Sequence, residues 1–318
     1  AQRVRDVIID QPSVLERFTP PPTRPPGIGL TVTDDVAGVA PTALETVSFV
    51  FRGADIEGAV TLDPALFAPL YAGLVGRTVT LRDIEGVLDG IERIYREHDY
   101  YARAFAPRQD LADGRVRIVV YESYVREVVI EGDVENIRNL RERLQPYIDR
   151  IVEMRPVRIS RIMRYALLMT DLAGLTIEAE FSQIVEEPGA GRLVLRIDFN
   201  PSSFGVRLDN FASDDVGPLE LAGRARFNNA FGLFESTELL AVVNPAAPEE
   251  LALGKLSQHV PLGPGGFAAG YDYAQVWSNP AGDDDVHAET AQASVYLNYA
   301  VLRSQERNLI AALTLSGK

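Results

Sequence analysis

The feature that most constrains the fold is a run of alternating apolar and polar residues that begins after Phe199 and continues to the C-terminal residue. About seven segments of roughly 9–12 residues follow one another between turns, without an intervening helical pattern. In the first segment, Phe204, Val206 and Leu208 alternate with small or charged residues. This pattern predicts antiparallel strands with one apolar face, long enough to cross a bilayer when tilted. It favours a membrane β-barrel, with a soluble β-sandwich as the alternative.

The polar side of these segments carries charges of both signs. In a barrel with a polar lumen, that side of each strand lines the channel. We therefore predict four pore-lining residues, namely Arg207, Asp209, Arg224 and Arg226. Mixed charges in such a lumen would hydrate a passing chain without binding it tightly.

Two similar modules precede the alternating region. Each shows the order strand, helix, helix, strand, strand, which predicts a pair of βααββ modules. In the first module, apolar residues at helical spacing follow Thr80, and Asp83 stands where the acid of a capping box is expected. The expected fold class is α+β for the modules and all-β for the rest.

The N-terminal part has a different composition. Val4, Val7 and Ile8 are spaced as on a short amphipathic helix, and a flexible terminus is the alternative. Five prolines follow within residues 19–27, which predicts an extended linker.

One segment resembles a known family. Residues 91–123 read IERIYREHDYYARAFAPRQDLADGRVRIVVYES. They resemble the first POTRA domain of the outer-membrane transporters of two-partner secretion, the TpsB family, which export haemolysins and filamentous adhesins. Asp99 replaces the glycine that usually precedes the tyrosine of this pattern. The segment Val125–Gly132 is similar to the start of a second POTRA domain.

The alternating region also resembles this family, in the same order along the chain. The similar segments are residues 207–217, 229–239, 259–266 and 298–309. In the first of them, Ala212 and Val216 replace the family's glycine and threonine. The expected organisation is a plug helix (1–18), a Pro-rich linker (19–44), a first POTRA domain (45–123), a second (124–199) and the N-terminal part of a transmembrane β-barrel (200–318).

The resemblance implies a location in the bacterial outer membrane, with the POTRA domains in the periplasm. They would receive an unfolded exoprotein, which the barrel would conduct outward, and the first helix would plug the barrel. A family barrel has about sixteen strands, so we expect this sequence to hold only part of one. The alternatives are an assembly or insertion factor of the same superfamily and a soluble periplasmic POTRA-containing adaptor.

A three-stranded module covered by two helices leaves a strand edge, to which an extended polypeptide can add by main-chain hydrogen bonds. The expected edges are residues 101–106 and 175–185. We predict that the substrate-binding residues on or near these edges are Tyr100, Tyr101, Ala102, Phe105, Ile177 and Phe181.

Composition argues against other functions. The net charge of −14 disfavours a nucleic-acid surface. There is no cysteine and there are three scattered histidines, so we expect no metal, no cofactor and no catalytic residues. A charged, solvent-facing helix side explains an acidic group in the first module, made up of Asp83, Glu85, Asp89 and Glu92. We expect a monomer whose partners are the exoprotein and outer-membrane lipid.

Overall fold

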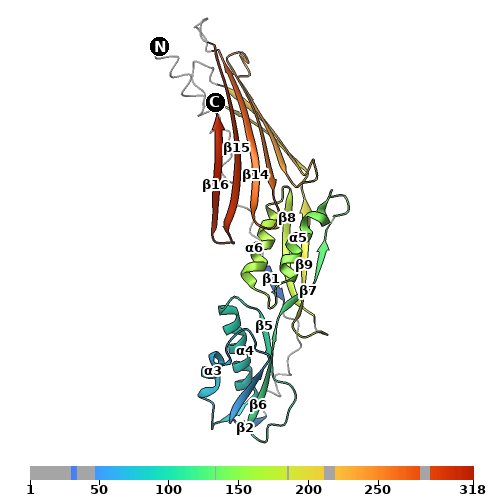
Figure 1. The fold of residues 1–318 in the computed structure, drawn as a ribbon, viewed down its shortest axis with the longest axis vertical. Helices are drawn as coiled ribbons and strands as arrows, with labels where there is room; N and C mark the ends of the chain where they lie inside the picture. The colour runs from blue at the N-terminus through green and yellow to red at the C-terminus, as the bar shows by residue number, and fades with distance from the viewer. Residues whose placement is uncertain (1–29, 34–46, 133, 185, 211–218, 280–286) are drawn as a thin grey trace.

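The computed structural model describes residues 30–33, 47–132, 134–184, 186–210, 219–279 and 287–318. The predicted plug helix and most of the predicted linker lie outside these residues. Three parts follow one another along the long axis of the molecule (Figure 1): a first α/β module, a second α/β module and an antiparallel sheet.

The first module packs helices against a small sheet. Its elements are β2 (Ser48–Val50), β3 (Gly53–Glu57), η1 (Pro64–Phe67), α3 (Ala68–Ala72), β4 (Thr78–Thr80), α4 (Leu81–Glu97), β5 (Ala102–Phe105) and β6 (Arg115–Glu122). The sheet has the order β3-β6-β5, with β3 parallel and β5 antiparallel to β6. Phe51, Phe67 and Ile118 are fully buried in its core.

Helix α4 begins where the sequence predicts. Asp83 accepts a hydrogen bond from the main-chain N–H of Thr80 at 2.7 Å, so the capping box is formed. The helix buries Ile84, Ile91 and Tyr95 at helical spacing against the sheet. Among the helices that the structure describes, none is long and apolar enough to span a membrane.

The second module repeats the order strand, helix, helix, strand, strand, without counterparts of η1 and of the paired strands β2 and β4. It contains β7 (Tyr124–Glu131), α5 (Leu140–Val152), α6 (Ile159–Thr170), β8 (Leu175–Gln183) and β9 (Ala190–Phe199). A further strand, β1 (Leu30–Thr33), joins this sheet from the N-terminal side of the first module, which gives the order β1-β8-β9-β7. The βααββ order predicted for both modules is confirmed.

The third part is a seven-stranded antiparallel sheet in chain order. Its strands are β10 (Ser202–Asp209), β11 (Glu220–Asn228), β12 (Ser236–Val243), β13 (Leu251–Pro261), β14 (Phe267–Ser278), β15 (Ala288–Arg303) and β16 (Asn308–Gly317). The expected strand-rich region, with about seven strands, is confirmed.

The three parts are closely joined. Ser123 alone separates β6 from β7, and two residues separate β9 from β10. The second module also contacts strand β15 of the sheet. There, the guanidinium of Arg303 donates to both carboxylate oxygens of Asp171, at 3.0 and 2.6 Å. The Arg303 side chain is only 5% exposed and that of Asp171 is 38% exposed, so the ion pair is shielded from water on the arginine side.

Candidate functional site

The strand register gives the seven-stranded sheet one predominantly polar face. Paired residues of neighbouring strands point to the same side, so the pairs Arg207–Ala222 and Arg226–Glu238 lie on one face. This face, called here the inner face, carries all four residues that the sequence predicts as pore-lining: Arg207, Asp209, Arg224 and Arg226.

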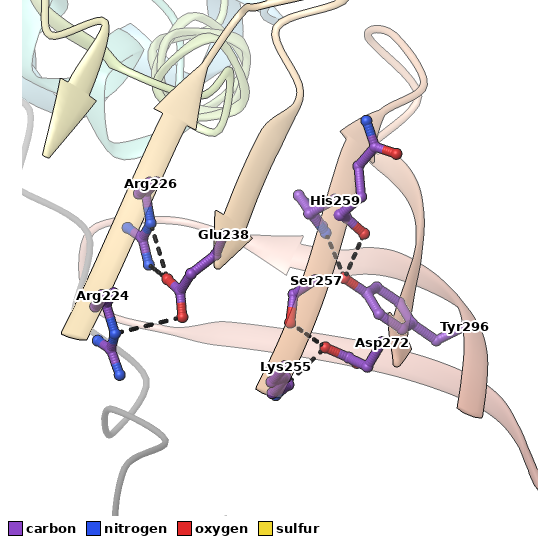
Figure 2. Close-up of polar contacts among 9 residues, drawn as sticks. Arg224, Arg226, Glu238, Lys255, Ser257, His259, Asp272 and Tyr296 are labelled. Carbon is purple, nitrogen blue, oxygen red and sulfur yellow. Dashed lines mark hydrogen bonds and ion pairs between the residues drawn. The ribbon is translucent and has the colours of Figure 1, made fainter. Parts of the chain in front are cut away.

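The charges of the inner face are paired with one another, across strands or along one strand. Figure 2 shows Arg224 and Arg226 of β11 pointing toward Glu238 of β12. The Arg226 guanidinium donates to Glu238 Oε2 at 2.7 Å, and Arg224 Nε lies 3.5 Å from Oε1. Farther along β10, Arg207 Nε lies 3.0 Å from Asp209 Oδ2. The charged groups are therefore held in fixed positions by one another.

A second polar group continues across the next strands (Figure 2). Ser257 Oγ of β13 donates to Asp272 Oδ1 of β14 at 2.6 Å, and Lys255 Nζ lies 3.4 Å from the same oxygen. His259 Nδ1 lies 3.3 Å from the hydroxyl of Tyr296 on β15. Polar side chains thus cover the middle of the inner face over five adjacent strands.

The inner face is apolar at the end of the strands that lies away from the second module. Leu240, Val242, Leu253 and Val276 form a buried cluster there. The prediction of a polar lumen therefore describes only part of this face.

The other face of the sheet is apolar and exposed. Phe204, Val206 and Leu208 of β10 are 72, 80 and 62% exposed. The same face continues on the later strands with Leu239, Tyr273, Trp277, Val295, Leu297, Leu313 and Leu315. A contiguous apolar surface of this kind fits a lipid environment.

In the first module, strand β5 forms one edge of the sheet, as expected. Tyr101 and Ala102 are buried, at 5 and 2% exposure, so their side chains belong to the core. Phe105 is 40% exposed and stacks on Tyr121 with ring centroids 5.5 Å apart. Of these three predicted binding residues, only Phe105 offers its side chain to a partner.

The edge strand β5 is partly blocked by a carboxylate. Ala104 N–H donates to Glu92 Oε1 of α4 at 3.1 Å, and Arg103 Nε lies 3.4 Å from the same oxygen. Glu92 is a buried residue, 9% exposed. The interpretation of Glu92 as part of a solvent-facing side is therefore wrong, because its side chain turns onto the strand edge.

In the second module, the expected edge is occupied. β1 pairs in parallel with β8, from Leu30 opposite Ala179 to Thr33 opposite Ser182. The predicted binding residues Ile177 and Phe181 are 1 and 2% exposed. Their side chains are core residues, so any contribution that they make to binding must come through the main chain of β8.

Tyr100 lies at the joint between the two modules. The guanidinium of Arg158 donates to the Tyr100 hydroxyl at 2.6 Å and lies over its ring. The neighbouring Tyr101 ring meets that of Phe181 edge to face, with centroids 5.5 Å apart. These tyrosines therefore hold the modules together, and the structure brings Tyr101 and Phe181 into direct contact.

Comparison with known proteins identifies the first module. Residues 49–123 match the family described as "POTRA domain, ShlB-type". The fold, a pair of POTRA-like modules followed by an antiparallel sheet, is similar to that of two solved CdiB structures.

Particular relatives are similar over more of the chain. The heme/hemopexin transporter protein HuxB of Haemophilus influenzae (strain 86-028NP) is 24% identical over 174 residues, which are 54% of this chain and 30% of HuxB. The structure of CdiB from Escherichia coli matches with a TM-score of 0.63 and 18% identity, over 99% of this chain and 57% of that one. CdiB from Acinetobacter baumannii matches with a TM-score of 0.53 and 13% identity, over 99% of this chain and 60% of that one.

The chain thus spans less than two thirds of the length of each of these relatives. HuxB is named as a transporter, which agrees with the expectation of a non-enzymatic role. Within the described residues, no three acidic or histidine side chains are grouped so that they could hold a metal ion.

Sequence reasoning missed Glu92 and β1. Glu92 follows Ile91 directly and lies one turn before Tyr95, so its position beside the apolar stripe was the available signal. The alternation in LTVT at residues 30–33 was the signal for β1.

Proposed function

We propose that the chain belongs to a transporter that takes up an unfolded exoprotein of the haemolysin or adhesin type in the periplasm and conducts it outward through a β-barrel. The two-faced sheet that directly follows the POTRA modules carries this proposal. Its exposed apolar face suits outer-membrane lipid, and its paired charges suit a hydrated path.

The exoprotein would first meet the POTRA modules as an extended chain. Strand addition at β5 uses main-chain hydrogen bonds, which do not require one particular sequence. Phe105 and Tyr121 provide an aromatic contact beside that edge. Tyr100, Tyr101 and Ala102 would act by holding the edge in place, since they pack at the joint and in the core. We propose that the transporter works as a monomer.

Export is the direct test. The full-length protein is expressed together with the exoprotein encoded beside its gene, and the exoprotein is measured in the medium and in the periplasm. We expect it in the medium only when the transporter is present. Equal export from cells that lack the transporter would contradict the proposal.

The lining role of the inner face has a separate test. We expect that reversing two charges with Arg224→Glu and Arg226→Glu changes single-channel conductance and shifts ion selectivity toward cations. Arg192→Glu with Arg196→Glu is the matched control, because it makes the same two changes in the second module, where Arg192 pairs with Glu127 and Arg196 with Glu131. Conductance and selectivity equal to the wild type in the double variant would remove these residues from the pore lining.

A further inference from the structure

A groove of about 360 Å³ lies in the second module, where α5 ends and α6 begins. Of the residues that line it, one, Glu153, carries a carboxylate. Four others are arginines, namely Arg150, Arg155, Arg158 and Arg161. All four are exposed, in a chain whose net charge is −14. This arginine groove is therefore a local concentration of positive charge on an acidic protein.

The positive charges of the arginine groove are not neutralised by the module itself. None of its four guanidinium groups forms an ion pair with a carboxylate of the described residues. Elsewhere in the same module, Arg192 pairs with Glu127 and Arg196 with Glu131. A guanidinium without a counter-charge keeps its N–H donors for a ligand, and a carboxylate can accept two of them side by side. The arginine groove is thus suited to an anionic partner.

Two of the arginines are held in place by tyrosine rings. The guanidinium of Arg155 lies over Tyr124, 3.9 Å from the ring centroid, and that of Arg158 lies over Tyr100, at 4.9 Å. Stacking of this kind uses the face of the guanidinium and leaves N–H groups at its edge. A long side chain that is already ordered loses less conformational freedom when a ligand binds. The groove is therefore partly preorganised.

The position of the arginine groove favours a polypeptide over a lipid headgroup. Helix α6 lies between the sheet and the first module (Figure 1). Arg158 directly precedes α6 and Asp171 directly follows it, so a helix of 12 residues, about 18 Å long, separates the groove from the ion pair that joins Asp171 to the sheet. Tyr100, which binds Arg158, is by contrast two residues before β5. A chain that pairs with β5 therefore passes close to the groove.

We propose that the arginine groove binds an acidic segment of the exported polypeptide, whose aspartate and glutamate side chains supply the carboxylates that the four arginines lack. This inference rests on the proposed function, because it takes the exported polypeptide as the ligand. Strand addition at β5 binds main chain of almost any sequence, whereas the groove selects for charge. A polypeptide that satisfies both is held at two points across the joint between the modules.

Peptide binding tests the charge preference directly. The full-length transporter is placed in phosphatidylcholine nanodiscs, and binding is measured by fluorescence anisotropy. The probe is a fluorescein-labelled peptide that carries four glutamates, and the same peptide with glutamines in their place is the comparison. We expect the glutamate peptide to bind the wild-type protein more tightly than the glutamine peptide does. Equal binding of the two peptides would overturn the proposal.

The groove variant is Arg150→Glu with Arg161→Glu, which changes the two arginines that do not stack on tyrosine. We expect it to bind the glutamate peptide about tenfold more weakly than the wild type does, because each reversal replaces an attraction by a repulsion. Arg150→Gln with Arg161→Gln removes the charges without reversing them and should give a smaller loss.

The matched control is Arg52→Glu with Arg141→Glu. Both arginines are exposed and lie outside the groove, and Arg141 stands in the first turn of α5 as Arg161 stands in that of α6. We expect the control to bind the glutamate peptide as the wild type does, because at physiological ionic strength charges more than about 8 Å apart are largely screened. Equal affinities of the groove variant and the control would overturn the proposal.

The lipid composition of the nanodiscs separates a polypeptide from a lipid as the ligand. We expect the glutamate peptide to bind the wild-type protein equally well in phosphatidylcholine and in phosphatidylglycerol nanodiscs. Binding that is lost in phosphatidylglycerol would assign the groove to an anionic headgroup and would overturn the proposal.

Export separates this inference from the proposed function. We expect the groove variant to export the exoprotein about tenfold less than the control variant does, in line with its weaker binding. Undiminished export by the groove variant would overturn the role of the arginine groove and leave the transport function standing. A lack of export by the wild-type protein would instead contradict the transport function itself.

Discussion

At the scale of the residue, Asp99 joins the two modules through its carboxylate, which a glycine at this position would lack. Its backbone is left-handed, with φ of 68°. Its carboxylate accepts hydrogen bonds from the main-chain N–H of Ser160, at 2.8 Å, and from the Ser160 hydroxyl. Ser160 lies in the first turn of α6, so a residue of the first module caps a helix of the second.

We expect Asp99→Ala to loosen this cap. The variant loses the acceptor and strains the left-handed backbone, which together cost about 1–3 kcal/mol. Hydrogen exchange should show faster exchange at the amide of Ser160. Asp99→Asn is the control, because asparagine caps helices and tolerates this backbone. Unchanged protection in Asp99→Ala would show that the joint does not depend on the carboxylate.

The hydrogen bonds of Asp83 predict that the first module loses stability in acid. Hydrogen bonds from Thr80 N–H and hydroxyl hold the pKa of Asp83 below its ordinary value of 3.8. A lowered pKa in the folded state stabilises the fold above the unfolded-state value, and this contribution is lost as pH falls through the folded-state pKa. We expect the urea midpoint of Asp83→Asn to fall less than that of wild type between pH 5 and pH 2, values that bracket the ordinary carboxylate pKa of about 3.9. Equal falls of the urea midpoint in the variant and the wild type would contradict this contribution of Asp83 to stability.

At the scale of the element, the sequence pattern predicted those features that depend only on residues close together in the chain. Phe204, Val206 and Leu208 point to one face because side chains alternate along a strand. Thr80 and Asp83 marked the start of α4 because capping is local. The pairing of β1 with β8 joins Leu30 to Ala179, and no local pattern specifies such a distant partner. Glu92 was misinterpreted because a helical pattern does not show which way a long side chain at the border of a stripe turns.

Strand β9 contains a close contact that should be sensitive to one methyl group. A Cβ at Gly191 would lie 2.1 Å from the ring of Phe181. We expect Gly191→Ala to lower the melting temperature of the protein, because the ring is buried and also contacts Tyr101. The destabilisation should be about 1–3 kcal/mol. Gly73→Ala is the control, since its Cβ would meet no atom within 4 Å. A melting temperature as high as that of the control would refute this packing argument.

At the scale of the whole molecule, a partly buried ion pair joins the second module to the sheet. Arg303 on β15 binds Asp171 at the end of α6, and Asn308 accepts a further hydrogen bond from the guanidinium at 3.0 Å. Separating such a pair leaves a charge in a poorly hydrated place.

We expect Asp171→Asn to destabilise this junction by about 1–3 kcal/mol, because the buried Arg303 loses its counter-charge. Limited proteolysis of the full-length protein should then cut near residue 171 sooner than in the wild type. A double variant, Asp171→Leu with Arg303→Met, removes both charges and should recover much of the resistance. Equal cleavage rates in the wild type and Asp171→Asn would show that this ion pair does not hold the second module to the sheet.

The close succession of strands has a mechanical consequence. The chain passes from β6 to β7 through Ser123 alone, and from β9 to β10 through two residues. There is no slack at either joint that could absorb a pull. A load on the first module is therefore passed directly to the first strand of the sheet, so the two modules act as a stiff arm attached to that strand.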